Sequence, residues 1–440
     1  MDTRFAPRLP HPLYADHVLY HGSETRTGSP SVRAWAFNGW RRESLSWRKT
    51  CYIHAGLSSS GPISIKGRDA RKYLQGILIN SLEKFPIGSM KHGVMCSEAG
   101  LIAAHGIVER KSDDHFESWA GGPPGLRMRD RISFDVEIKR LDYYLFQIAG
   151  PTSLKVLEKV TGESLRDLGF LRFRDTRING IRCEIGRIGM TGGLAYELHG
   201  PIEDATAIYE AVYRAGQEFG IERLGWGTYL VNHVEGGFPQ YTWTLLNDIG
   251  ADRQGELMKA FYVSGSVDPA NLRARMRTPV EVRWHNMAKF DHDFIGREAL
   301  AAEMANPKRT TVTLRWNADD VMDTYASLVR KGDAYTPIDL PYSPQRWPMA
   351  HADHVLGRDD RETGYSSGTV YSSFFREFLS LGCLNIEAAR IGNEVVVQWG
   401  DHGGPIKSIR ATVERFPYFT DGRNSDVDVF KLPTNQGMPT

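Results

Sequence analysis

The spacing of apolar residues changes character near residue 305, and this change limits the folds open to the chain. From residue 60 to about 220, strand-like and helix-like segments alternate. Beyond residue 305, the strand-like segments 310–317, 394–400 and 408–419 follow one another with few helical patterns between them. Such an order is typical of an α+β body joined to a smaller, mainly β domain. We therefore expect an α+β fold that ends in a β-rich domain.

Short patterns within residues 60–220 predict individual elements. Asn179-Gly180 lies between two alternating apolar runs, which predicts a β-hairpin over 176–185. Apolar residues at helical spacing, followed by a glycine in two of the three segments, predict helices. The predicted helices are 67–80, 151–162 and 203–220, and the predicted strands are 62–67 and 143–150.

Composition along the chain predicts four regions. Residues 1–45 are irregular and rich in Gly, Ser, Pro and Arg, but Trp35, Trp40 and Trp47 nearby indicate an arm packed on the body. We expect the body at 46–305, the β-rich domain at 306–425 and a loosely held tail at 426–440.

The composition also excludes several classes of partner and site. The chain has 440 residues and a formal net charge of +1, which gives no reason to expect nucleic acid or a membrane surface as partner. No apolar run reaches the roughly 18–20 residues of a membrane span, and the first residues lack a signal-peptide core. We expect a cytoplasmic protein. The cysteines form no CxxC spacing, which indicates free thiols; they are Cys51, Cys96, Cys183 and Cys383.

Three short motifs suggest chemistry but lack the context it needs. "GYSSG" (364–368) fits a serine nucleophile elbow around Ser366, yet that motif requires a parallel α/β sheet and this segment lies in the β-rich part. We expect a turn there. The histidine clusters "HADH" (351–354) and "KFDHDF" (289–294) have no second ligand pair at a recognised spacing. We expect polar loops at both and no metal site.

Four segments together, in order, resemble the aminomethyltransferase (T-protein) family of the glycine cleavage system. They are "GMTGGLAYELHGP" (189–201), "VEGGFPQY" (234–241), "KFDHDFIGREAL" (289–300) and "GYSSGTVYS" (364–372). The resemblance covers about residues 60–420. It implies an aminomethyltransferase-like folate-binding fold, in which two intertwined subdomains and a C-terminal β-barrel-like domain surround a central folate channel.

Within that superfamily the sequence is more similar to the tetrahydrofolate-dependent aryl O-demethylases that act on vanillate and syringate. The resemblance places Tyr241 of "PQYT" (239–242) on their catalytic tyrosine. An aryl ether is a poor electrophile, so the departing oxygen needs a proton or hydrogen bond, which a tyrosine hydroxyl can supply. The alternative is that Tyr241 lines the pocket without a proton role.

The same resemblance implies a folate-binding group of residues. Glu197 corresponds to the carboxylate that binds the pterin ring, where it can accept paired hydrogen bonds from the 2-amino and N3–H groups. Tyr196, Gly192 and Glu235 are expected to join it in binding the cofactor. The alternative for Glu197 is a strand residue that faces solvent.

His105 stands at or next to the position where the family carries an aspartate near the reacting folate nitrogen. Histidine can relay a proton, because its ordinary pKa suits neutral pH, or it can be a packed, hydrogen-bonded residue. His233, Trp243 and Tyr229 are candidates for the wall of the substrate pocket, since aromatic walls suit a planar ring. An ordinary core explains them nearly as well.

Two departures from the vanillate-type enzymes bear on the substrate. This chain has "SSSG" (58–61) in place of their His-His, and Gly121-Gly122 in place of an arginine; Arg127 or Arg129 does not fall in register. Because arginine is the natural partner of a carboxylate, its absence indicates an aryl ether without one. The same reasoning equally allows a methylenedioxyphenyl compound as the substrate, as in the sesamin-metabolising relatives.

The sequence therefore predicts an enzyme that moves a one-carbon group, methyl or methylene, from a lignin- or lignan-type aryl ether to tetrahydrofolate and releases a phenol or catechol. Two alternatives stand beside it: a glycine-cleavage aminomethyltransferase, and a non-catalytic folate-binding assembly factor. The signature of that factor, Lys-Gly-Cys-Tyr-x-Gly-Gln-Glu, does not occur in the chain. The choice between methyl and methylene and the oligomeric state stay open.

Overall fold

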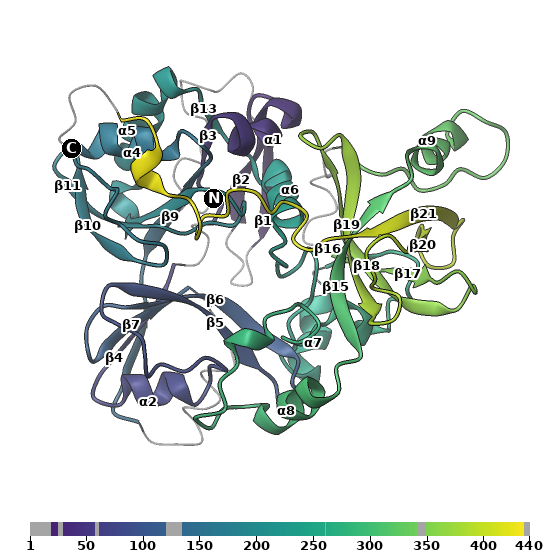
Figure 1. The fold of residues 1–440 in the computed structure, drawn as a ribbon, viewed down its shortest axis with the longest axis horizontal. Helices are drawn as coiled ribbons and strands as arrows, with labels where there is room; N and C mark the ends of the chain where they lie inside the picture. Colours follow the sequence, from purple (N-terminus) through teal and green to yellow (C-terminus); the bar gives the residue numbers. More distant parts are fainter. Residues whose placement is uncertain are drawn as a thin grey trace.

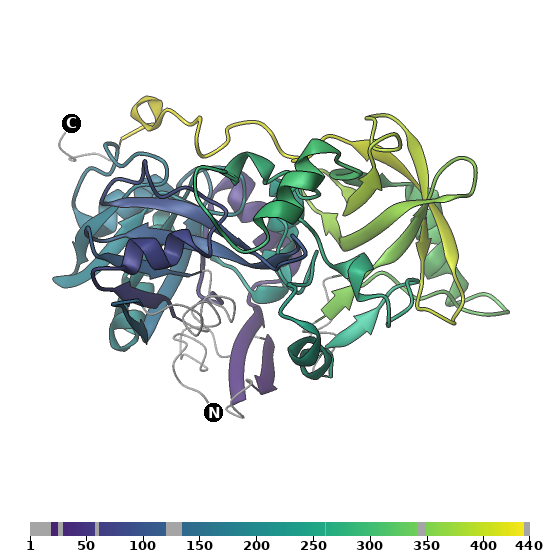
Figure 2. The same cartoon turned by 90° about the horizontal axis from the view of Figure 1, so that it is seen from below.

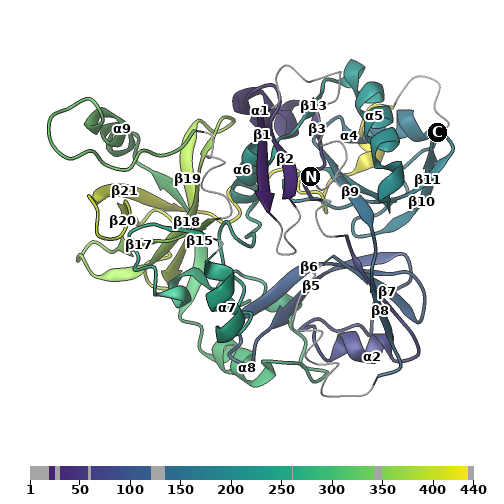
Figure 3. The ribbon, with the colours of Figure 1, turned by 180° about the vertical axis from the view of Figure 1, so that it is seen from behind.

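Three bodies of the chain surround a common centre, as Figure 1 shows face-on and Figure 3 shows from behind. Two of them are sheets covered by helices, and the third is a closed β-barrel. This computed structural model describes residues 19–24, 30–57, 61–119, 134–259, 261–340 and 349–434. The arrangement confirms the predicted α+β class with a C-terminal β domain.

The first body is a six-stranded sheet in the order β10-β11-β12-β9-β3-β13. Two helices pack on one of its faces, and their apolar sides form a core with the strands. Its elements are β3 (Cys51–His54), β9 (Tyr143–Ala149), α4 (Ser153–Thr161), β10 (Phe173–Ile178), β11 (Ile181–Gly186), β12 (Ala195–Pro201), the short helices η1 (Ile202–Asp204) and η2 (Gln217–Phe219), α5 (Ala205–Gly216) and β13 (Ile221–Arg223).

Local sequence explains several of these elements. Asn179 and Gly180 have φ values of 50° and 81°, the left-handed conformations that a two-residue hairpin turn requires. Ile178 and Ile181 pair directly across that turn. The predicted hairpin is confirmed, as are the helices that end at Gly162 and Gly220, both in the left-handed conformation.

The second body is a five-stranded antiparallel sheet in the order β5-β6-β7-β4-β8. Its elements are β4 (Ile63–Lys66), α2 (Ala70–Gln75), β5 (Ser89–Cys96), β6 (Ile102–Arg110), β7 (His115–Ser118) and β8 (Glu137–Arg140). The helix predicted over 67–80 is shorter than expected. Beyond Gly76 the backbone leaves the helix, and the Ile79 amide donates to the Val94 carbonyl on β5, so sheet pairing replaces the last helical turns.

An N-terminal segment and a central helix fill the space between the first sheet and the barrel. The elements are β1 (Leu19–Glu24), β2 (Pro30–Ala36), α1 (Trp40–Lys49) and α6 (Trp226–Gly236). Trp35 and Trp47 are buried in one cluster with residues of α6 and the barrel. The arm is therefore packed on the body, but it is more regular than expected, with a strand pair that projects from the body in Figure 2.

A connecting region leads from α6 to the barrel. It contains α7 (Ala251–Met258), β14 (Tyr262–Ser264), η3 (Leu272–Arg275), η4 (His285–Met287), α8 (Arg297–Ala305) and β16 (Met349–His351). The barrel closes in the order β15-β19-β18-β17-β20-β21. Its elements are β15 (Arg309–Trp316), α9 (Ala318–Ser327), β17 (Asp353–Leu356), β18 (Glu362–Ser372), β19 (Glu377–Asn385), β20 (Glu394–Trp399) and β21 (Lys407–Glu414).

The barrel corrects two sequence expectations. The "GYSSG" segment is not a turn but part of β18, where Ser366 is fully buried and donates to Ser380 on β19 at 2.8 Å. "HADH" is not a polar loop but the junction of β16 and β17, where His351 pairs with Asp353 at 2.7 Å. Alternating burial in a closed barrel hides polar residues that look exposed in the sequence.

The segment after β21 returns across the molecule to the first sheet (Figure 1). Arg166 donates to the carbonyls of Val429, Leu432 and Pro433, and Val429 is 3% exposed in the core of the first body. The tail predicted to be loose is thus docked as far as residue 434, with a short helix η6 (Val429–Lys431). Residues 435–440 lie outside the described part.

Two further features bear on the class of protein. All four cysteines are buried and free, as expected. Among the described helices, none has the length and apolar character needed to cross a lipid bilayer.

A buried carboxylate joins the N-terminal segment, α6 and the barrel. Glu235 accepts hydrogen bonds from Trp47 at 2.8 Å, from Arg48 at 3.0 Å and from Ser372 at 2.6 Å. The side chains of Glu235 and Arg48 are 0% and 3% exposed. A buried ion pair whose carboxylate has further donors is costly to break from one side.

Replacing Glu235 by Gln leaves the buried Arg48 guanidinium without a counter-charge, so we expect the free energy of unfolding to fall by about 3 kcal/mol. Chemical denaturation measures this change. Glu218→Gln is the matched control, because Glu218 forms an exposed ion pair with Lys159 that is worth under about 1 kcal/mol. Equal stability of the two variants would contradict the structural role of Glu235.

Candidate functional site

Glu197 lies in the middle of β12, opposite Gln147 of β9. Its side chain is 2% exposed. One carboxylate oxygen, Oε1, accepts from Gln147 Nε2 at 3.1 Å. The other, Oε2, lies 3.4 Å from His199 Nε2 and accepts no hydrogen bond within the described ranges. A buried carboxylate oxygen with spare acceptor capacity is a binding point for an N–H group of a ligand.

A chain of polar side chains holds Gln147 in place behind Glu197. Tyr52 donates its hydroxyl to the amide oxygen of Gln147, and Asn232 of α6 donates to Tyr52 at 3.2 Å. Because the Gln147 oxygen accepts, its amide nitrogen must point at Glu197. Burial raises the pKa of Tyr52 far above its usual range, so the hydroxyl remains a donor at neutral pH.

On the side away from Glu197, the site includes Tyr229 and His233, which lie one turn apart on α6. Burial first, and then the nearby charge of Glu197, raise the pKa of Tyr229, whose ring stacks on His54 at 4.1 Å. The ring of His233 lies 4.8 Å from that of Tyr229. His233 Nδ1 donates to the Phe238 carbonyl at 3.0 Å, which makes Nε2 an acceptor; in the described structure this nitrogen has no partner.

A pair of histidines on adjacent strands forms the end of the site opposite Glu197. His92 of β5 and His105 of β6 are joined through Nε2 and Nδ1 at 3.3 Å. Trp284 packs against both rings, at 4.6 and 4.9 Å, and Phe238 packs against His92 at 5.0 Å. The outer nitrogens, His92 Nδ1 and His105 Nε2, are buried and have no hydrogen-bond partner among the described residues.

Burial decides the protonation of these histidines. It lowers the pKa of His105 to about 4 and that of His233 to about 3, and it lowers the pKa of His92 well below its usual range. At neutral pH all three are uncharged, so each ring offers one N–H donor and one acceptor. Of the two roles that the sequence leaves open for His105, proton relay or packed residue, the lowered pKa favours the neutral, packed one.

These residues follow one another in a row of side-chain contacts, which we call the wall; its ring distances are 4.8 Å from Tyr229 to His233, 6.2 Å from His233 to Phe238 and 6.5 Å from Phe238 to His105. It runs from Glu197 past Tyr229, His233 and Phe238 to His105, and so joins the first sheet, α6 and the second sheet. A charged acceptor stands at one end and neutral imidazoles stand at the other.

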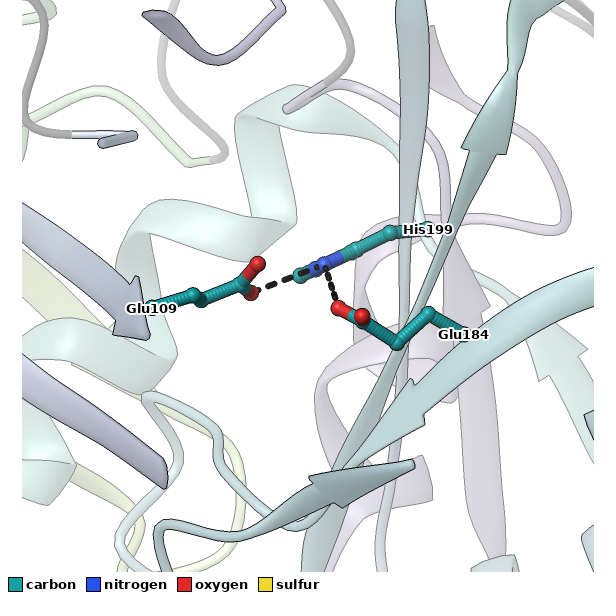
Figure 4. A group of neighbouring side chains, drawn as sticks. All are labelled: Glu109, Glu184 and His199. Atoms are coloured by element: carbon teal, nitrogen blue, oxygen red, sulfur yellow. Dashed lines mark ion pairs between the residues drawn. The ribbon is translucent and has the colours of Figure 1, made fainter. Parts of the chain in front are cut away.

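Glu109, Glu184 and His199 gather in one group of charged side chains, as Figure 4 shows. His199 Nδ1 lies 3.1 Å from Glu109 of β6 and 3.5 Å from Glu184 of β11. Lys111 Nζ lies 2.7 Å from Glu109 and 2.5 Å from Glu184. The ligand atoms of Glu109, Glu184 and His199 are within 4.8 Å of one another, and the Lys111 ammonium pairs with both carboxylates.

The protonation states of this cluster follow from its charges. Although burial alone raises it, the pKa of Glu109 is lowered to about 2 by the charge and hydrogen bond of His199. Burial lowers the pKa of His199, but Glu109, Glu184 and Glu197 outweigh burial and hold it well above its usual range. At neutral pH His199 is an imidazolium between three carboxylates.

Tyr241 and Trp243 follow the wall in sequence but belong to other clusters. Tyr241 is half-buried, and its ring lies 6.4 Å from that of Phe261 in the connecting region. Trp243 is 1% exposed and packs with Tyr229 and barrel residues in one cluster. The predicted aromatic neighbourhood thus exists, and Trp243 lies in its core. The catalytic role of Tyr241 stays a prediction.

Three residues expected to bind the cofactor have other surroundings. Tyr196 follows the alternation of β12 and points into the core, away from Glu197. Gly192, with φ 80°, lies beneath Arg423, whose Nη1 atom would be 2.3 Å from an added Cβ. Both oxygens of Glu235 are bonded within the protein. Their surroundings also give each a structural explanation, and their part in cofactor binding stays a prediction.

The paired glycines of "HVEGGFPQYTW" also have a packing explanation. Gly237 ends α6 with φ 67°, and an added Cβ would lie 2.5 Å from Pro417; at Gly236 a Cβ would lie 2.5 Å from the Met190 carbonyl. Close approach of the C-terminal segment and the loop before β12 therefore requires glycine at both positions.

Sequence reasoning missed the partners that set the geometry: His92, Gln147, His199, Phe238 and Trp284. One signal was available for His199, because period-two alternation on β12 places it on the same face as Glu197. The other partners come from distant segments. Residues 58–60, Gly121-Gly122, Arg127 and Arg129, which carried the argument about the substrate carboxylate, lie outside the described residues.

Comparisons with known proteins show which proteins this chain is similar to. Two relatives match almost end to end: a sesamin methylene transferase from Sinomonas sp. is 36% identical, covering 96% of this chain and 98% of its own, and a syringate O-demethylase from Sphingobium sp. is 27% identical, covering 91% and 93%. An aminomethyltransferase from Thermoanaerobacter pseudethanolicus is 23% identical over 78% of this chain and 80% of its own.

A solved structure supports the fold, and a family profile identifies the family. The crystal structure of the glycine cleavage system aminomethyltransferase T from Bartonella henselae superposes with a TM-score of 0.67 at 17% identity, covering 92% of this chain and 94% of that one, which supports the fold alone. The profile of the GCVT N-terminal domain matches residues 14–252. With more than half of its length matched by that profile, and with a relative 36% identical over 96% of it, the chain belongs to the GCVT family.

Proposed function

We propose that this protein transfers a one-carbon unit from an aryl ether without a carboxylate to tetrahydrofolate and releases a phenol or catechol. The observation that carries the proposal is the buried wall between Glu197 and His105, with an acceptor carboxylate at one end and neutral imidazoles at the other. We further propose that the substrate is a methylenedioxyphenyl compound and that the unit is a methylene group. The 36% identity to a sesamin methylene transferase supports this choice.

At the folate end, the chain's own residues bind and orient the ring. Glu197 accepts hydrogen bonds from the N–H edge of the pterin, while Gln147 holds the other carboxylate oxygen at 3.1 Å. When bound, tetrahydrofolate supplies a nucleophilic ring nitrogen for the one-carbon unit. Holding that nitrogen next to the reacting carbon replaces a bimolecular encounter with an oriented one. This orientation is the main source of rate acceleration for the transfer that these residues offer.

At the reacting end, the residues manage protons and exclude water. Release of a methylene bridge breaks two carbon–oxygen bonds, and the two protons that the catechol oxygens gain equal the two that the folate nitrogens give up; Tyr241 is the proposed proton donor to the first departing oxygen. Neutral His105 offers a hydrogen-bond donor and an acceptor without adding charge, and His92 connects to its inner nitrogen at 3.3 Å. Phe238 packs on the ring of His92, and Trp284 packs on the ring of His105.

We expect anaerobic incubation with tetrahydrofolate and a methylenedioxybenzene to give 5,10-methylenetetrahydrofolate and a catechol, both identified by mass. A methoxyphenol is the comparison substrate, and a methoxybenzoate tests the expected exclusion of a carboxylate. 5-Methyltetrahydrofolate as the main product would change the transferred unit to methyl. Turnover only with an aminomethyl-carrier protein would make the chain an aminomethyltransferase, and folate binding without any turnover would favour an assembly factor.

Tyr241→Phe should lower kcat by about 10²–10⁴-fold, because it removes the proton donor for the departing oxygen. The dissociation constant of tetrahydrofolate should stay unchanged, since Glu197 is intact. Tyr262→Phe is the control, because Tyr262 is 40% exposed on the nearby strand β14. Equal kcat values for the two variants would remove Tyr241 from the mechanism.

The pH dependence of kcat/KM tests the neutral state of His105. Burial lowers its pKa to about 4, so the imidazole is neutral above that pH and gains a proton only below it. We therefore expect no loss of activity attributable to His105 between pH 8 and about pH 5. A decline with a midpoint near the ordinary histidine value of about 6.5 that disappears in His105→Asn would contradict this assignment.

A further inference from the structure

We propose that His199 is a positioning residue for folate binding: its imidazolium bridges Glu197 to Glu109 and Glu184, and so holds the Glu197 carboxylate in the orientation that receives the pterin ring. The inference rests on the proposed function. It concerns a residue that touches neither the folate nor the reacting atoms and acts only through Glu197.

The geometry of the ring supports the bridge. His199 Nε2 lies 3.4 Å from Glu197 Oε2, and Nδ1 on the other side of the ring lies 3.1 Å from Glu109 Oε1 and 3.5 Å from Glu184 Oε1. The side chain is 3% exposed, and Trp119 packs on it at a ring distance of 4.5 Å. Two carboxylates face the ring at Nδ1 and Trp119 packs on it, while Nε2 faces Glu197 at ion-pair distance without a hydrogen bond.

The charges around His199 explain why the bridge must be an imidazolium. Carboxylates face it from three strands: Glu109 on β6, Glu184 on β11 and Glu197 on β12. Lys111, itself 2.7 Å from Glu109 and 3.3 Å from Glu117, neutralises the outer part of this group but makes no ion pair with Glu197 among the described contacts. His199 is therefore the cation that serves the folate-binding carboxylate, and without it Glu197 would face buried negative charge.

The bridge also joins two sheets that share no strand pairing. Glu109 belongs to the second sheet, and His199 and Glu197 belong to the first. Glu109 and His105 are four residues apart on β6, so they lie on the same face of that strand, about 13 Å apart. The ion pair at Glu109 therefore adds a buried contact between the strand of His105 and the strand of Glu197.

The test compares His199→Gln with the wild-type protein in two measurements. The dissociation constant of tetrahydrofolate alone, determined by anaerobic titration calorimetry, should rise about tenfold or more, the size expected for a charge-assisted contact. At saturating folate, kcat should change less than about threefold, since the reacting end is intact. A merely structural role would instead reduce the active fraction and leave the dissociation constant of the remaining protein unchanged.

His115→Gln is the matched control, because His115 and His199 line the same cavity of about 590 Å³ between the two sheets. His115 bonds to Ser64 at 2.9 Å and makes no contact with Glu197 among the described residues. Its variant should bind folate as the wild type does. Glu109→Gln is a second variant in case His199→Gln does not fold; it removes one end of the bridge and should also weaken folate binding.

The outcomes separate this inference from the proposed function. Wild-type affinity in both His199→Gln and Glu109→Gln would overturn the inference and leave the proposed function standing. Loss of folate binding when a chelator is added to the wild type would also overturn it, because a metal would then hold the carboxylates. Failure of the wild type itself to bind tetrahydrofolate would overturn the proposed function, and the inference with it.

Discussion

The ion pair between Glu109 and His199 is a buried charged contact between the two sheets of the body at the central site. The sheets share no strand, and backbone contacts also join them, since the Met90 amide donates to the Leu171 carbonyl and the Phe173 amide to the Gly88 carbonyl. A buried charge pair is directional, and displacing either group leaves an uncompensated charge in an apolar setting. The same principle recurs at Glu235, which joins the N-terminal helix and the barrel to α6. The three bodies are thus held together at points of buried charge.

Environment divides the buried histidines into two kinds. His199 is surrounded by carboxylates, and their charge outweighs burial, so it stays protonated. His92, His105 and His233 are surrounded by aromatic rings and by one another, and burial keeps them neutral. The residue type alone predicts neither state. Their opposite protonation gives the site a charged end that can anchor a ring and an uncharged end where bonds can change without ions nearby.

Features that depend on local sequence were predictable, and features that depend on distant partners were not. The hairpin at Asn179-Gly180 follows from turn chemistry within four residues. Glu197 was found through a motif, yet the same motif also suggested Tyr196, which strand alternation turns into the core. The partners of Glu235 come from α1 and β18, so no local pattern could show that its carboxylate was already occupied. His199 needed the register of three strands before its role could be seen.

The distribution of charge also gives a physical reason for substrate choice. The residues described at the reacting end, namely His92, His105, His233, Phe238 and Trp284, carry no charge at neutral pH. A neutral aryl ether can enter such surroundings without leaving a buried charge unpaired. A substrate carboxylate would need a cation, and these five residues offer none, whereas the two cations of the site, His199 and Lys111, are already engaged by glutamates at the folate end. In the proposed reaction, the buried network keeps the charge of the proposed folate end away from the ether bond that breaks.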